Sequence, residues 1–211
     1  MRTFAYALLS ALLFTLPAHA AKSTANSPDT VVKNAVNNLQ TQLKKNAPKY
    51  KANPGQFQKL VQNAVVPYFD TRYIAQLVMG RHWRDADEQQ RKRFEGAFKT
   101  MLINTYANAM LEYYNSVKID WKPLRLDPEA TDATVNSALL REGKPPISIG
   151  FSMHKNDDKW QIFDITVENI SLVDNFRAQV SSEIKRTSID DVIQRMETGT
   201  YGGKVQIKAK S

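Results

Sequence analysis

The chain has 211 residues, with 29 Lys and Arg against 21 Asp and Glu, a formal net charge of +8 and no cysteine. The lack of cysteine excludes disulfides, thiol catalysis, iron–sulfur clusters and thiolate zinc sites. For an exported protein, the positive charge fits an anionic membrane surface or an acidic protein partner better than nucleic acid, with a well-solvated surface as the alternative.

Residues 1–20 have the three parts of a signal peptide. Arg2 gives a positive start, an apolar run extends from Ala5 to Leu16, and Ala18-His19-Ala20 supplies small residues for the peptidase. An uncleaved anchor is disfavoured, because a spanning helix needs about 20 apolar residues. We predict cleavage after Ala20. An exported protein without disulfides suits the periplasm of a Gram-negative bacterium.

Residues 21–198 are predicted to form a single domain that begins and ends with helices. Apolar residues recur at three- and four-residue steps in six segments. Pro48 lies just beyond the first of them, and Asn53-Pro54 opens the second as a helix cap and first turn. The fourth is long enough to brace a whole sheet, at roughly 40 Å. The predicted helices are about 29–46, 53–66, 70–79, 87–114, 171–186 and 188–198.

The middle of the chain is predicted to form an antiparallel sheet of about four strands. Alternating residues indicate strands near 117–126, 131–141, 145–155 and 159–167, with a turn at 156–158. The short connections favour a meander. The predicted class is therefore α+β, with a helical shell packed on one face of a curved sheet. Residues 199–211 are rich in Gly and Lys and are predicted to be a flexible tail.

Catalytic constellations are scarce in this sequence. His82 and His154 have no second ligand at metal-binding spacing, so each is interpreted as a surface or hydrogen-bonded histidine. Asp70 is placed to cap the third helix. Asp164 interrupts an apolar strand, where it pairs with an arginine, marks a bend, or acts as a general base in a buried cleft. No catalytic residue, cofactor or metal is predicted.

Two groups of residues, in order along the chain, resemble the MlaC-type or toluene-tolerance family. The first group is Val66–Asp70, Leu77–Trp83, Gln90–Arg91, Phe94, Phe98, Leu102 and Tyr106. The second group is Trp160, Asp164, Ile170–Val173, Phe176–Arg177 and Ile189–Ile193. Ser188 stands where the family commonly has Gly, and Met196 where it commonly has Leu, so these departures concern only the last helix.

The resemblance implies a periplasmic phospholipid carrier that is not an enzyme. Such carriers move lipid between an outer-membrane lipoprotein–porin complex and an inner-membrane ABC transporter with an MCE-domain subunit, and so maintain outer-membrane lipid asymmetry. An apolar pocket between helices and sheet holds the acyl chains of a diacyl lipid. About 30 methylenes at about 0.8 kcal/mol each make unassisted transit through water prohibitive. A cavity of roughly 1,000 Å³ is expected.

Apolar residues on the facing helices and strands are the candidates for phospholipid binding, with ordinary core packing as the alternative for each. They are Phe69, Ile74, Leu77, Val78, Phe98, Leu102, Tyr106, Ile147, Ile149, Phe151, Phe163, Ile165 and Ile170. Ile170 is expected at the pocket mouth. Met110 and Met153 are expected to adapt to tails of varied shape.

Four arginines are the polar residues considered for binding. Arg81, Arg84, Arg91 and Arg93 are candidates for contact with lipid phosphate or an acidic partner, with a solvated face as the alternative. Little head-group specificity is expected, because no compact polar cluster is evident. Two other functions stay open: a small cavity enzyme of isomerase type that uses Asp164, and a lipid-independent periplasmic adaptor.

Overall fold

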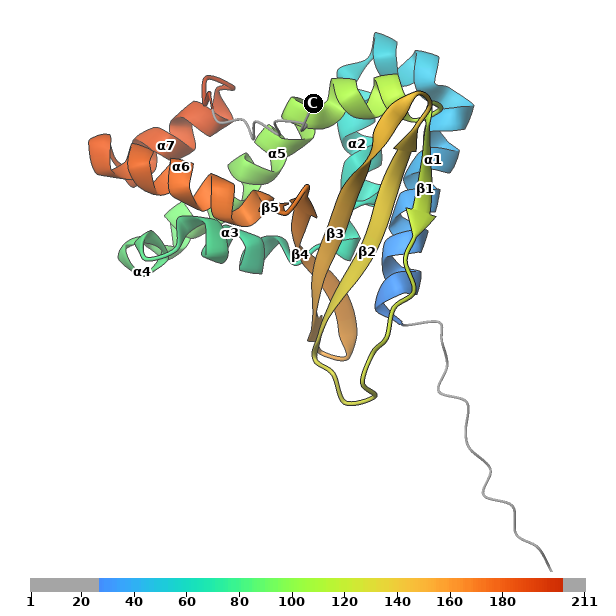
Figure 1. Ribbon diagram of the computed structural model, residues 1–211. Helices are drawn as coiled ribbons and strands as arrows, with labels where there is room; N and C mark the ends of the chain where they lie inside the picture. The colour runs from blue at the N-terminus through green and yellow to red at the C-terminus, as the bar shows by residue number, and fades with distance from the viewer. Residues whose placement is uncertain (1–26, 203–211) are drawn as a thin grey trace, which may run out of the picture.

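The computed structural model describes residues 27–202 and confirms the α+β class (Figure 1). The predicted signal peptide, its cleavage site after Ala20 and residues 203–211 of the predicted tail lie outside this range. Within it, helices precede and follow an antiparallel sheet, in the predicted order. No helix in this range is long and apolar enough to cross a membrane.

The first helical segment, α1 (Pro28–Ala52), is longer than predicted. It was expected to end near Asn46 because Pro48 follows. Instead the chain bends at Asn46, where φ is −136° and ψ is 15°, and the helix resumes. Pro48 then lies in the first turn of the resumed segment, where a missing N–H is tolerated. Asn53 caps α2 (Pro54–Ala64) through its side chain, as predicted.

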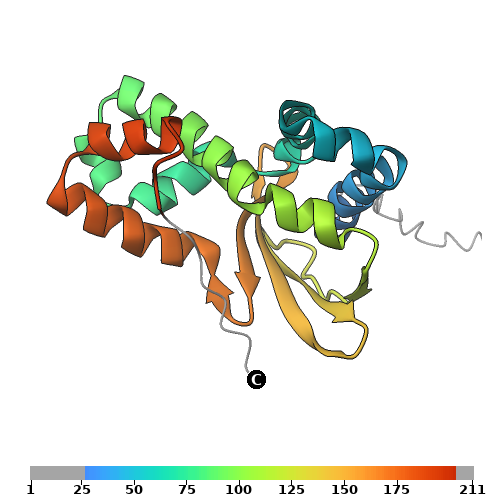
Figure 2. The ribbon, with the colours of Figure 1, turned by 90° about the horizontal axis from the view of Figure 1, so that it is seen from above.

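The third and fourth predicted helices are confirmed as α3 (Thr71–Met79) and α5 (Glu88–Tyr113). A turn of 3-10 helix, Val66–Tyr68, precedes α3, and a single helical turn, α4 (His82–Asp85), follows it. A reciprocal pair of hydrogen bonds between Asp87 and Gln90 starts α5. With 26 residues, α5 is about 39 Å long. It runs from the group of C-terminal helices to the edge of the sheet and to α2 (Figure 2).

The sheet has five antiparallel strands in sequential order. They are β1 (Val117–Trp121), β2 (Asp132–Arg141), β3 (Lys144–Asn156), β4 (Lys159–Val167) and the two-residue β5 (Ile170–Ser171). The predicted first strand is shorter than expected, because the chain leaves the sheet after Trp121. In β4 the register shifts between the pairs Ser152–Asp164 and Met153–Ile162, which makes Phe163 an extra, bulged residue.

Two helices close the fold, α6 (Leu172–Arg186) and α7 (Ile189–Glu197), both as predicted. The packed part of the chain extends beyond the predicted boundary at residue 198, because Tyr201 is buried. The backbone N–H of Tyr201 donates to the carbonyl of Arg195, and burial raises the pKa of Tyr201 to about 12.

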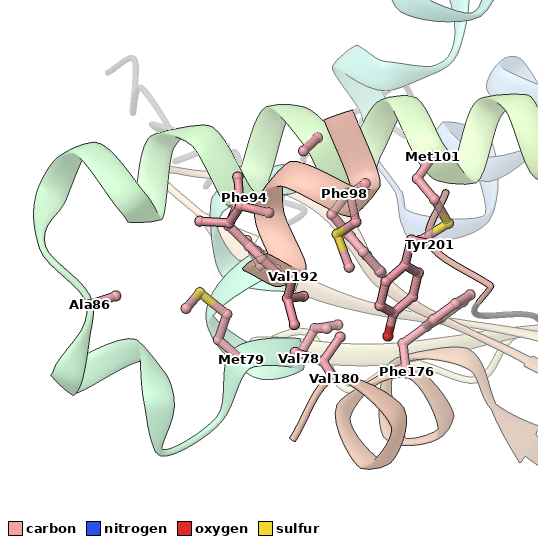
Figure 3. Packing of buried hydrophobic residues seen from close by; sticks show 14 of the residues in the cluster. Val78, Met79, Ala86, Phe94, Phe98, Met101, Phe176, Val180, Val192 and Tyr201 are labelled. Carbon is pink, nitrogen blue, oxygen red and sulfur yellow. The ribbon is translucent and has the colours of Figure 1, made fainter. Parts of the chain in front are cut away.

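Buried apolar side chains form three separate clusters. The helical cluster joins α3, the first half of α5, α6 and α7, and includes Phe94, Phe98 and Phe176 (Figure 3). The N-terminal cluster joins the end of α1, α2 and the second half of α5 around Phe57. The sheet cluster packs the start of α1, at Val32, on β2, β3 and β4. Because α5 belongs to two clusters, it links the two ends of the molecule.

Candidate functional site

An apolar pocket of about 170 Å³ lies where the three clusters meet. Twelve of its lining side chains are apolar or aromatic, and three are polar. They are Val61, Val65, Val66, Phe69, Thr71, Ile74, Glu95, Phe98, Lys99, Leu102, Ile103, Tyr106, Met110, Ile165 and Leu172. A second cavity of about 80 Å³ adjoins it and shares Phe69, Ile74, Phe98, Leu102, Ile165 and Leu172. The two cavities therefore form one apolar site.

Helix α5 forms the longest wall of this pocket. Phe98, Leu102, Tyr106 and Met110 follow one another at four-residue steps, so they lie along one face of the helix. The opposite wall comes from shorter elements: the end of α2, the start of α3, β4 and the first residue of α6. Since these elements belong to different clusters, the pocket is a seam between packed units rather than a void within one of them.

The structure brings seven predicted binding residues together in this site. Phe69, Ile74, Phe98, Leu102, Tyr106 and Ile165 line the larger cavity, and Phe163 lines the smaller one. Phe163 reaches it as the bulged residue of β4. The predicted residues Phe98, Leu102 and Tyr106, which are four positions apart on α5, therefore all line the same cavity. Met110 extends the same stripe, whereas Met153 is fully buried in the sheet cluster.

Two predicted residues of α3 pack in the core instead. Val78 has no exposed surface and Leu77 packs against the same helical cluster. On a helix of nine residues, Ile74 faces the pocket while the side of Val78 and Met79 faces α5 and α6. Apolar character alone does not distinguish these two faces.

Four predicted strand residues lie beside the pocket without lining it. Phe151 pairs with Ile165, and Ile149 pairs with Val167, which pairs in turn with Ile170. Directly opposed residues in antiparallel strands share a face. The fourth residue, Ile147, lies two positions before Ile149 and four before Phe151 on β3. Its side chain is therefore on the same face of the sheet as theirs. All four are half-buried, and they continue the apolar surface of Ile165 across the sheet.

Several lining residues were not predicted. Val65 and Val66 come from the connection between α2 and α3, and Leu172 is the first residue of α6, directly after β5. Their lining position depends on how those connections fold, which carries no periodic signal. The polar residues Thr71, Glu95 and Lys99 were also missed, because charged positions on a helix are typical of a solvated face.

Asp164 holds the wall of the pocket in place. Its two carboxylate oxygens accept hydrogen bonds from the Ser171 hydroxyl at 2.6 Å and the Val173 backbone N–H at 3.0 Å. It thus pairs with no arginine. It fixes the start of α6 against the bulge of β4, and a bend was one of its predicted roles.

Replacing Asp164 with Ala should destabilise the protein by about 2–3 kcal/mol, because two charge-assisted hydrogen bonds at a helix start are lost. Urea unfolding followed by circular dichroism measures this change. Glu112→Ala, on the exposed side of α5, is the control and should change stability by less than about 0.5 kcal/mol. Equal urea midpoints for the two variants would contradict the role of Asp164 in holding the start of α6.

The two histidines are both hydrogen-bonded, and neither lines the pocket. His154 Nε2 lies 3.0 Å from Asp70 Oδ2, and its ring stacks on Tyr73 with centroids 4.7 Å apart. Asp70 also accepts from the Tyr73 N–H at 2.9 Å, which confirms it as the cap of α3. His82 Nε2 is 3.2 Å from the Ser181 hydroxyl. Among residues 27–202, no three His, Asp or Glu side chains form a metal site.

Two of the four candidate arginines have structural partners. Arg93 pairs with Asp190 at 3.0 Å and Glu197 at 2.9 Å, and so ties α5 to α7. Arg91 donates to the carbonyl of Trp83 at 2.9 Å and lies over its ring. Arg81 and Arg84 are exposed. None of the four lines the apolar pocket.

Comparison with known proteins agrees with this architecture. The family model described as MlaC protein matches residues 33–198. The chain belongs to the MlaC family. The match covers the helices and strands that build the pocket, from α1 to α7.

Individual relatives extend the comparison over most of the chain. The intermembrane phospholipid transport system binding protein MlaC of Haemophilus influenzae is 24% identical over 192 residues, covering 88% of this chain and 89% of the relative. Toluene tolerance protein ttg2D of Pseudomonas putida is 26% identical over 171 residues, covering 79% and 77%.

A solved structure shares the fold. The phospholipid-binding protein of Ralstonia solanacearum, determined in complex with a phospholipid, is 26% identical to this chain, with a TM-score of 0.76. The alignment covers 82% of this chain and 97% of that one. This MlaC-family protein therefore has the same arrangement of helices and sheet as a protein that was solved with a lipid bound.

Proposed function

We propose that this MlaC-family protein is a phospholipid carrier of the periplasm, and that its apolar pocket takes up the acyl chains. The observation that carries the proposal is the pocket itself, which is lined by apolar or aromatic side chains at every fourth position of α5 from Phe98 to Met110. The phospholipid named for the Haemophilus relative and bound in the Ralstonia structure supports the same ligand class.

The size of the pocket requires it to widen when lipid enters. The cavities of about 170 and 80 Å³ are well below the roughly 1,000 Å³ expected for a diacyl lipid, so the expected volume is wrong for this conformation. Widening at a seam between clusters separates packed units without opening the interior of any one of them. The half-buried apolar residues Ile149, Val167 and Ile170 adjoin this seam and would cover the additional length of chain.

The proposal also covers the cellular location of the carrier and its partners. Residues 1–20 act as the signal peptide, with cleavage after Ala20. The carrier receives or delivers lipid at an outer-membrane lipoprotein–porin complex and at an inner-membrane ABC transporter with an MCE-domain subunit. It does so by transient docking, and it thereby maintains outer-membrane lipid asymmetry. The function needs no catalytic residue, cofactor or metal.

The enzymatic alternative has no support from the carboxylate that it requires. Both oxygens of Asp164 are engaged in holding Ser171 and Val173. Asp164 does line the smaller cavity, but every other residue that lines this cavity is apolar, so no second polar group is present there to orient a substrate. The adaptor alternative leaves the apolar pocket without a purpose.

Native mass spectrometry of the mature protein tests the carrier function. The protein should carry diacyl phospholipid after purification, or after incubation with liposomes once delipidated. A delipidated protein that takes up no lipid from liposomes would overturn the proposal and favour the adaptor.

A further inference from the structure

Three of the four polar residues that line the two cavities lie together at one end of the larger cavity, and the fourth, Asp164, lines the smaller cavity. Glu95 and Lys99 are one turn apart on α5, and Thr71 is the first residue of α3. The other lining positions of α5, from Phe98 to Met110, are apolar or aromatic. Glu95 and Met110 are 15 residues apart, or about 22 Å along the helix. The pocket is therefore amphipathic along its length, as a phospholipid is.

The charged groups at this end are only partly engaged. The Thr71 hydroxyl donates to Glu95 Oε1 at 2.6 Å, which orients that carboxylate. Glu95 and Lys99 have the spacing of a helical ion pair, yet no ion pair joins them. The neighbouring cation, Arg72, is held by Glu88 at 3.1 Å. Among the described residues, Lys99 is thus the cation at this end that has no carboxylate partner.

We infer that Thr71, Glu95 and Lys99 form a head-group site for zwitterionic phospholipids with a primary amine. The inference rests on the proposed carrier function. Lys99 pairs with the phosphodiester, and the oriented Glu95 carboxylate pairs with the head-group ammonium. Both side chains are half-buried, so the head group stays at the solvent-exposed end while the tails extend toward Met110. This inference differs from the expectation of little head-group specificity, and the experiment below distinguishes the two.

The charges at this end also select against anionic lipids. A head group of glycerol type has a phosphodiester and no ammonium. It satisfies Lys99 but leaves Glu95 facing additional negative charge. The selection should be modest, because partly exposed ion pairs contribute little. We expect the protein to take up the amine lipid over the glycerol lipid by about two- to fivefold from an equimolar mixture.

Competitive loading tests this site. The delipidated protein is incubated with vesicles of equal parts phosphatidylethanolamine and phosphatidylglycerol, and native mass spectrometry gives the ratio of the two complexes. Glu95→Gln should bring the ratio close to one, because it lowers the loading of the amine lipid and raises that of the glycerol lipid. Glu95→Lys should invert the preference. Lys99→Gln should lower the loading of both lipids by about two- to fivefold.

Matched controls separate this inference from the carrier function. Lys92→Gln, on an exposed position of the same helix, should keep the wild-type ratio and loading. Circular dichroism checks that each variant is folded. If the wild type loads neither lipid, the carrier function fails. If it loads both and the Glu95 variants keep the wild-type ratio, the carrier function stands and the head-group site is overturned.

Discussion

A Leu102→Glu variant should lose phospholipid retention by at least about 100-fold. Leu102 lines both cavities near the middle of the α5 wall, so a carboxylate there faces the acyl chains. Burying an ionised or unpaired polar group against hydrocarbon costs about 3 kcal/mol or more, which corresponds to this factor. Displacement of a fluorescent phospholipid measures the affinity.

The control for this variant is Thr100→Glu. Thr100 is exposed on the same helix, where its hydroxyl donates to the carbonyl of Gly96. It should bind lipid with wild-type affinity. Wild-type retention by a folded Leu102→Glu protein would show that the acyl chains lie elsewhere.

A Phe98→Ala variant should be strongly destabilised without lipid and much less so with lipid. Phe98 is buried, and its ring contacts Phe94 and Phe176 with centroids 5.6 and 5.2 Å away (Figure 3). Removing it should cost about 3–5 kcal/mol in the lipid-free protein. Because Phe98 also lines the pocket, an acyl chain can fill the vacated space, so lipid should restore part of this loss.

Urea unfolding of lipid-free and lipid-loaded protein measures the difference. Phe94→Ala is the matched control, because Phe94 is fully buried in the same cluster but does not line the pocket. It should cost a similar amount in both states. If lipid rescues neither variant, or rescues both equally, Phe98 does not touch the ligand.

The elements that were predicted well depend on local signals. The caps at Asn53 and Asp70 and the long apolar period of α5 all follow from residues that are close together in the sequence. The features that were missed depend on distant contacts. After Pro48, α1 resumes and packs Tyr50 against Phe57 of α2. The bulge at Phe163 accompanies a hydrogen bond that the Asp164 carboxylate accepts from the Val173 N–H at the start of α6.

The residues of the site also divide into those that local sequence signals predict and those that depend on distant contacts. The stripe of Phe98, Leu102 and Tyr106 was predictable, because a helix places residues four apart on one face. The separation of Ile74 from Val78 was not, since both are apolar and only the tertiary packing assigns one to the pocket and the other to the core. Lys99 was missed for the opposite reason: a charge on a helix is usually solvated, and only the packed structure puts it at a pocket edge.

Photocrosslinking from the tail of a bound phospholipid tests the central claim most directly. A lipid with a diazirine near the methyl end of one acyl chain is loaded, irradiated and mapped by tryptic mass spectrometry. The account predicts label in the peptide of residues 100–118, at Tyr106 or Met110. Label concentrated in the peptide of residues 187–195, which covers most of α7 and contributes nothing to the pocket, would contradict it.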